Sequence, residues 1–152
     1  MAAPGMDPWL GLSLGLLLVA INGFFVAAEF ALVKLRPTQI QPRVDKGEVR
    51  AKMTQHVLER MASYLSAAQL GITLASLALG WIGEPAFAWI LRPLFEQIPG
   101  ASPSMLHSAS VTAAFFTITT LHIVLGEQAP KWLGLKHPEA VSLWIAIPMF
   151  LF

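Results

Sequence analysis

Three long stretches without an Asp, Glu, Lys or Arg decide what this chain can fold into. They run from Pro8 to Ala28, from Met61 to Gly83 and from Gln97 to Gly126, and each holds the roughly 20 residues that a helix needs to cross a bilayer. Only 12% of the residues are charged, whereas soluble domains average about 25%. Because hydrocarbon offers no partner to backbone polar groups, such a segment must be a helix. We therefore predict an all-α membrane protein with three transmembrane helices.

Shorter elements are predicted between and after these stretches. Pro37 ends the first helix, and Gly47 interrupts a basic segment whose second half is amphipathic, as expected at the inner membrane interface. Its apolar residues recur at every fourth position: Val49, Met53, Val57 and Met61. Four prolines follow the second stretch, where we expect a separate outer helix anchored at headgroup level by Trp81 and Trp89. Gly11 and Gly15 have the spacing that lets membrane helices approach closely, although glycine is also common in such helices.

These signals give one set of expected boundaries for a single domain covering residues 1–152. We expect transmembrane helices at residues 8–35, 63–82 and 104–129, an amphipathic inner segment at 36–62, an outer interfacial helix at 85–96 and a juxtamembrane helix at 138–152.

Basic residues are concentrated between the first and second stretches. Seven of the ten lie there: Lys34, Arg36, Arg43, Lys46, Arg50, Lys52 and Arg60. The positive-inside rule places this segment in the cytoplasm, the N-terminus outside and the C-terminus in the cytoplasm. A cleaved signal peptide is disfavoured, because the residues before the first stretch contain Asp7 but no base and the stretch is too long.

Polar residues within the apolar stretches indicate the function. Asn22 lies in the first helix, and Ser66, Gln69, Thr73 and Ser76 form one stripe on the second. Such a stripe can simply hydrogen-bond helices together. In the third helix Glu127 ends 30 residues without an acid or a base, and a carboxylate there costs about 3 kcal/mol or more without a partner. Pro130 should break the helix and free the carbonyl of Gly126.

Together these side chains offer hard oxygen ligands from three helices. We predict a metal site whose ligands are Asn22, Ser66, Gln69, Thr73, Gly126 and Glu127. Such oxygens suit magnesium, calcium or sodium and argue against zinc or copper. One carboxylate among neutral oxygens suits a transport site, which must also release its ion. No enzyme is expected, since neither HExxH nor GxSxG occurs.

Three blocks resemble one known family. NGFFVAAEFALVKLR (Asn22 to Arg36), QLGITLASLALGWIGEP (Gln69 to Pro85) and GEQAPKWLGL (Gly126 to Leu135) are similar, in this order, to the transmembrane domain of the CorC family, bacterial relatives of the cyclin M (CNNM) magnesium transporters. The resemblance implies a homodimer in the bacterial inner membrane, with a Mg2+ site in the membrane core. It also implies Mg2+ export coupled to Na+ entry.

When the family's motifs are compared position by position, Glu127 looks like the acidic ligand of that family, with Gly126 beside it. Asn22 matches the polar residue that opens the first-helix motif. Relatives often have asparagines where this chain has Ile72 and Thr73, so the second-helix ligands stay open. They often have serine at Val26, so any Na+ site there stays open too.

Two alternatives to Mg2+ export stay open at this point. One is a non-transporting membrane anchor or scaffold for a cytoplasmic regulatory region, and the other is an exporter of another divalent cation. Members of the family continue into cytoplasmic CBS and CorC domains. These domains are absent from residues 1–152, and we expect the chain to be part of a longer protein.

Overall fold

The computed structural model describes residues 7–97, 100 and 102–152, and it is all-helical there. Its elements are α1 (Pro8–Lys34), α2 (Pro37–Asp45), α3 (Val49–Glu59), α4 (Met61–Phe95), α5 (Pro103–Leu121), the π-helical η1 (His122–Gln128), α6 (Ala129–Lys136) and α7 (Pro138–Leu151). Three helical stretches, Pro8–Lys34, Met61–Phe95 and Pro103–Lys136, are long and apolar enough to cross a membrane. The prediction of an all-α fold with three such helices is therefore confirmed.

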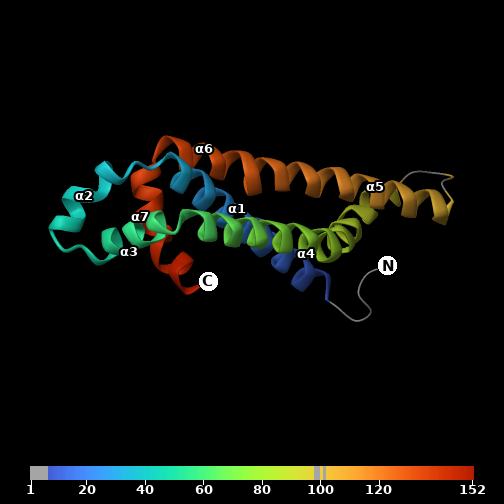
Figure 1. The fold of residues 1–152 in the computed structure, drawn as a ribbon. Coiled ribbons are helices and arrows are strands. Elements are labelled where there is room, and N and C mark those ends of the chain that lie inside the picture. Colours follow the sequence, from blue (N-terminus) through green and yellow to red (C-terminus); the bar gives the residue numbers. More distant parts are fainter. Residues whose placement is uncertain (1–6, 98–99, 101) are drawn as a thin grey trace.

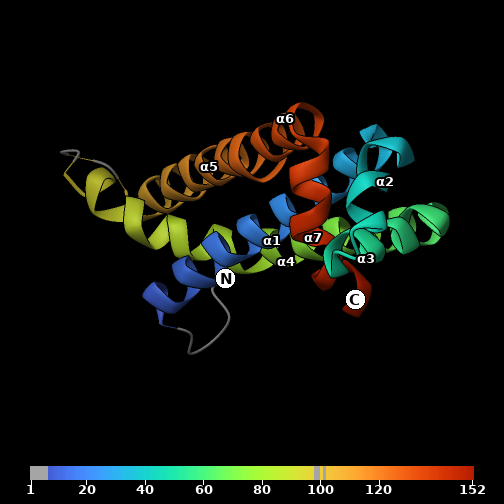
Figure 2. The same ribbon diagram turned by 90° about the vertical axis from the view of Figure 1, so that its left-hand side faces the viewer.

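Helix α1 is the central element of the fold. It packs against α4 and, in its later part, against η1 and α6, whereas α5 packs directly on α4 (Figures 1 and 2). Half of the most apolar part of α1 is buried, against 22% for each of the other two candidate spans. The short helices α2, α3 and α7 gather at one end of the molecule, which is also the end that carries most of the bases (Figure 1).

Glycines allow these helices to touch through their backbones. A Cβ atom on Gly15 would lie 3.6 Å from the Cα atom of Gly83, so α1 and α4 meet here with little between them. On α6, a Cβ atom on Gly134 would lie only 2.8 Å from the carbonyl oxygen of Ala27 on α1. Because lipid gives helices no hydrophobic reason to associate, such close packing is a main source of their attraction. The predicted role of Gly15 in close helix approach is confirmed.

The expected boundary between a second crossing and an outer helix is wrong. Residues 63–82 and 85–95 belong to one helix of 35 residues, α4, which contains Pro85 and Pro93 and ends one residue before the expected end of the outer helix. A proline removes one backbone hydrogen bond and bends a helix, but membrane helices often continue through it. Figure 1 shows α4 turning toward α5 in its last part. Trp89 packs edge-on against Trp9 of α1, with ring centroids 6.0 Å apart.

The segment 36–62 divides at the predicted glycine, and the buried face of α3 shares Val57 with the expected stripe. Gly47 has φ +82°, a backbone conformation that favours glycine, and separates α2 from α3. Of the expected stripe, Val57 is buried, whereas Val49 is 65% exposed. The buried residues of α3 are Ala51, Thr54 and Val57, because α7 covers that side of the helix.

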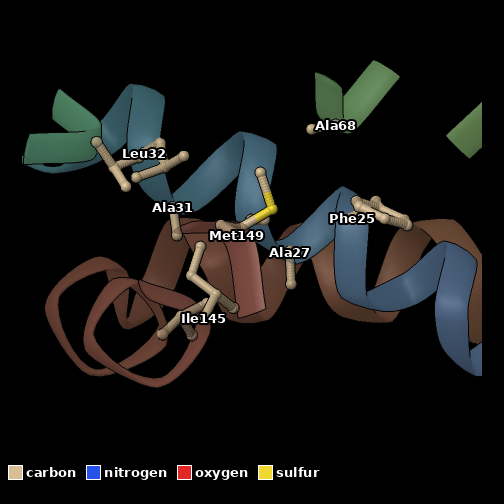
Figure 3. Close-up of a cluster of buried hydrophobic side chains, with 10 residues drawn as sticks. Phe25, Ala27, Ala31, Leu32, Ala68, Ile145 and Met149 are labelled. Atoms are coloured by element: carbon tan, nitrogen blue, oxygen red, sulfur yellow. The ribbon is translucent and has the colours of Figure 1, made fainter. Parts of the chain in front are cut away.

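Helix α7 completes the core at this end. Its Ile145 and Met149 belong to the same buried cluster as Ala31 and Leu32 of α1 (Figure 3). An ion pair of 3.2 Å between Arg43 of α2 and Glu139 of α7 joins the two short helices at the surface. The short helices thus pack on one another, and α7 packs on the last part of α1.

The contact between α6 and α1 gives a first prediction. In Gly134→Ala the new Cβ atom would press against the carbonyl oxygen of Ala27 at 2.8 Å and the amide nitrogen of Ala31 at 3.0 Å. Backbone atoms cannot move aside as a side-chain tip can, so we expect a lower thermal unfolding midpoint in detergent.

Gly80→Ala is the matched control, because a Cβ atom there meets nothing within 4 Å. Alanine favours a helix over glycine by about 1 kcal/mol, so this variant should be neutral or more stable. Equal midpoints for the two variants would contradict the packing described for α6.

Candidate functional site

The third candidate span contains a π-helical turn at the position where a break was predicted. Pro130 lies at the start of α6 and has no N–H, so the carbonyl of Gly126 lacks its usual α-helical donor. The helix does not break there, which corrects the prediction. It widens instead, and the N–H of Ala129 bonds to the carbonyl of Val124, five residues back. Single π-turns of this kind occur often at functional sites.

Asn22 joins this turn to the other two long helices. The side chain is fully buried, and its Nδ2 donates to the freed carbonyl of Gly126 over 2.9 Å. Ser76 Oγ of α4 donates to Asn22 Oδ1 over 3.1 Å. One amide group therefore connects α1, α4 and η1 at a single point.

The π-turn also aligns His122 with Glu127. In an α-helix, residues five apart point about 140° away from each other, whereas the i to i+5 bonding of a π-turn places them one above the other. His122 Nε2 lies 3.8 Å from Glu127 Oε1 and 3.5 Å from Ser76 Oγ. The Glu127 side chain is 42% exposed and that of His122 is 17% exposed.

The structure brings some of the predicted ligands together and leaves others apart. Asn22 and Gly126 are hydrogen-bonded to each other, and Glu127 follows Gly126 in the same turn. The Ser66 and Thr73 hydroxyls donate to carbonyls one turn back on α4, over 3.0 and 2.9 Å.

The remaining predicted ligand, Gln69, is engaged elsewhere. Its Nε2 donates to Glu29 Oε1 over 3.2 Å. Hydroxyls in helices commonly bond to their own backbone, as those of Ser66 and Thr73 do.

Two residues of the cluster were not among the predicted ligands. Ser76 belongs to the α4 stripe. Of the four residues of that stripe it lies furthest along the chain from the basic segment, and its expected depth in the membrane could have selected it. His122 lies one π-turn before Glu127, so its closeness to Glu127 depends on the wider backbone turn. In the sequence, Pro130 is the one sign of that turn.

Oxygen atoms dominate the chemistry of this cluster. Among the residues that the structure describes, no three His, Asp or Glu side chains gather as a metal cluster. The available oxygens belong to the Asn22 amide, the Ser76 hydroxyl, the Gly126 carbonyl and the Glu127 carboxylate. A groove of about 220 Å³ between α4 and α5 reaches Ser76 and His122. The cluster therefore has hard oxygen donors and an opening toward the surface.

A multi-pass membrane fold with a polar cluster at its centre is typical of transporters. The chain matches the Cyclin M transmembrane N-terminal domain over residues 14–152. It belongs to this family, which is linked to Mg2+ transport and whose members are generally transporters rather than enzymes. The resemblance drawn from the three sequence blocks is confirmed.

Curated relatives come from several bacteria. UPF0053 protein YugS of Bacillus subtilis is 44% identical over 135 residues, which cover 89% of this chain and 31% of YugS. UPF0053 protein YhdT of the same organism is 45% identical, over 89% of this chain and 29% of YhdT. Rv1841c of Mycobacterium tuberculosis is 34% identical over 97% of this chain and 41% of its own length. The chain thus spans less than half the length of these relatives.

The Asn22 contacts give a second prediction. Asn22→Leu keeps the size of the side chain but leaves the Gly126 carbonyl and the Ser76 hydroxyl without this partner. We expect the free energy of unfolding in detergent, without divalent cations, to fall by about 1–2 kcal/mol.

Ser66→Ala serves as the control, because the Ser66 hydroxyl bonds only back to Ala62 in its own helix. It should change the free energy of unfolding by a few tenths of a kcal/mol at most, roughly the worth of an exposed surface substitution. An Asn22→Leu variant as stable as Ser66→Ala would mean that the buried amide does not hold the helices together.

Proposed function

We propose that this chain is the transmembrane part of a Mg2+ transporter, which exports Mg2+ across the bacterial inner membrane in exchange for entering Na+. The observation that carries the proposal is the fully buried Asn22, bonded at once to Ser76 of α4 and to the freed carbonyl of Gly126. Glu127 stands beside this cluster and would supply its negative charge. Membership of a family linked to Mg2+ transport supports the same conclusion.

A cation would reorganise the hydrogen bonds of the cluster. At present Asn22 turns Nδ2 toward the carbonyl of Gly126, and an N–H cannot bind a metal. If the amide rotates, Oδ1 and the Gly126 carbonyl face the same point, where Ser76 Oγ and a Glu127 oxygen can join them. Mg2+ prefers octahedral oxygen ligands at about 2.0–2.1 Å and gives up its waters reluctantly, so water would complete the shell.

The other predicted ligands have a different place in this proposal. Ser66, Gln69 and Thr73 are exposed and lie on α4 between the cluster and the basic end of the molecule. We place them along the path of the ion, where they would contact it after α4 moves relative to α1. A single carboxylate in the site allows the release that alternating access requires, because a more highly charged site would hold the ion too tightly.

The orientation and assembly follow from the charge distribution and the exposed surface. The end of the molecule that carries α2, α3 and α7 is the basic one and would face the cytoplasm, with the start of α1 outside. Only 22% of the most apolar parts of α4 and of Pro103–Lys136 is buried within the chain. We propose that a second copy covers part of these faces and that lipid covers the rest.

Titration calorimetry with Mg2+ tests the role of Glu127. The unmodified chain should bind Mg2+, and Glu127→Gln should bind it at least about tenfold more weakly, because it loses the charge of the site. Glu96→Gln is the control, since Glu96 is exposed and pairs with Arg92 far from the cluster; it should bind as the unmodified chain does.

Flux measurements extend this test to transport. In liposomes that contain a Mg2+-sensitive dye, the unmodified chain and Glu96→Gln should move Mg2+ in response to a Na+ gradient, whereas Glu127→Gln should not. If Glu127→Gln remains folded and binds Mg2+ unchanged, the proposed site is wrong. If no form binds or moves Mg2+, a membrane anchor for a cytoplasmic regulatory region becomes the better interpretation.

The proposed assembly predicts a mass. Light scattering of the protein in detergent, corrected for the micelle, should give twice the chain mass of 16.5 kDa. A single chain mass at all protein concentrations would contradict the homodimer.

A further inference from the structure

We infer that His122 supplies a nitrogen ligand to the Asn22 cluster and makes the site bind Mn2+ and Co2+ more tightly than Mg2+. This inference deepens the proposed function and rests on it, because it takes the same cluster as a site for divalent cations. It concerns the selectivity of the site rather than its existence.

The position of the imidazole within the cluster supports this role. His122 Nε2 lies 3.5 Å from Ser76 Oγ and 3.8 Å from Glu127 Oε1, and Ser76 Oγ lies 3.1 Å from Asn22 Oδ1. Nε2 therefore faces the same small space as the oxygens. A contact of 3.5 Å is at the outer limit of a hydrogen bond, so Nε2 is only weakly bonded to Ser76. In the tautomer that carries its proton on Nδ1, Nε2 has a lone pair for a metal ion.

Gly126 leaves room for the ring in this position. A Cβ atom on residue 126 would lie 2.9 Å from His122 Cδ2 and 3.4 Å from Asn22 Nδ2. The imidazole thus packs against the backbone of the residue whose carbonyl belongs to the cluster, and only a glycine leaves room for it. Because the π-turn places His122 over Glu127, nitrogen and carboxylate reach the site from one element.

The chemistry of mixed nitrogen and oxygen ligands sets the selectivity. Mg2+ is a hard cation that prefers oxygen, whereas imidazole favours the first-row transition metals, with affinity rising from Mn2+ through Co2+ to Ni2+. Removing an oxygen of the cluster should therefore weaken the binding of every divalent cation. Removing the nitrogen should weaken Co2+ most, Mn2+ less and Mg2+ least.

Competition titrations of the full chain, without an affinity tag and at one fixed pH, test this inference. Dissociation constants for Mg2+, Mn2+ and Co2+ would be compared between the unmodified chain, His122→Gln and His122→Phe. We expect the unmodified chain to prefer Co2+ and Mn2+ over Mg2+, and the preference for Co2+ to fall by about tenfold or more in both variants. His107→Gln is the control, because His107 is exposed on α5, four turns away, and should leave all three constants unchanged.

Pulsed electron paramagnetic resonance of bound Mn2+ gives a second measurement that a merely structural role would not affect. A coordinated imidazole produces a 14N modulation, which should be present in the unmodified chain and in His107→Gln and lost in His122→Gln. Thermal unfolding of each variant shows whether it is folded. If His122→Phe does not fold, the affinities of His122→Gln and the 14N signal still test the role of His122.

Each outcome has a definite meaning. A uniform loss of affinity for all three cations in His122→Gln, or no 14N modulation in the unmodified chain, would overturn the inference and leave His122 as a residue that positions Glu127. Retention of Mg2+ binding by Glu127→Gln would instead overturn the proposed site. Binding of Mn2+ with a 14N modulation but without measurable Mg2+ binding would uphold the role of His122 and refute Mg2+ as the cargo.

Discussion

The hydrogen bond from Asn22 to the carbonyl of Gly126 is the interaction on which the centre of this protein depends. Pro130 cannot donate to that carbonyl, and an unpaired carbonyl among apolar side chains is costly. Asn22 provides the donor over 2.9 Å and then needs a donor for its own oxygen, which Ser76 provides. These two hydrogen bonds thus fix α1, α4 and η1 relative to one another along their axes. Apolar packing alone would hold their relative positions less strictly.

This polar connection requires helices that lie unusually close, because the side chain of asparagine is short. Gly23, next to Asn22, allows this close approach, because a Cβ atom on residue 23 would lie only 2.9 Å from the ring of Pro130. Gly71 of α4 makes similar room for the ring of Phe25. In lipid, close packing and interhelical hydrogen bonds are the forces that hold helices together. Here each depends on the other, because the hydrogen bonds form only where the glycines let the backbones approach.

Much of the fold follows from local patterns in the sequence. The three apolar stretches, the break at Gly47 and the helix of α7 need only hydropathy and glycine or proline chemistry, and the structure has them near the expected residues. The expectation that a helix ends before Pro85 failed, and the stripe through Val49 and Val57 did not indicate which of its residues the chain buries. Whether a helix continues through a proline, and which side of a short helix is buried, depend on the neighbours that it meets, here α1, α5 and α7.

The sequence by itself singled out Asn22, Gly126 and Glu127, because polar groups in apolar helices are costly and few. Only the tertiary structure decided which other residues join them. Ser66, Gln69, Thr73 and Ser76 share one stripe, yet only Ser76 lies at the level of Asn22, because the offset between α1 and α4 selects it. His122 reaches Glu127 only through a π-turn, and the carbonyl that Pro130 leaves free in this turn finds its donor on another helix. Spacing along one chain cannot specify that partner, since the offset is a property of two packed helices.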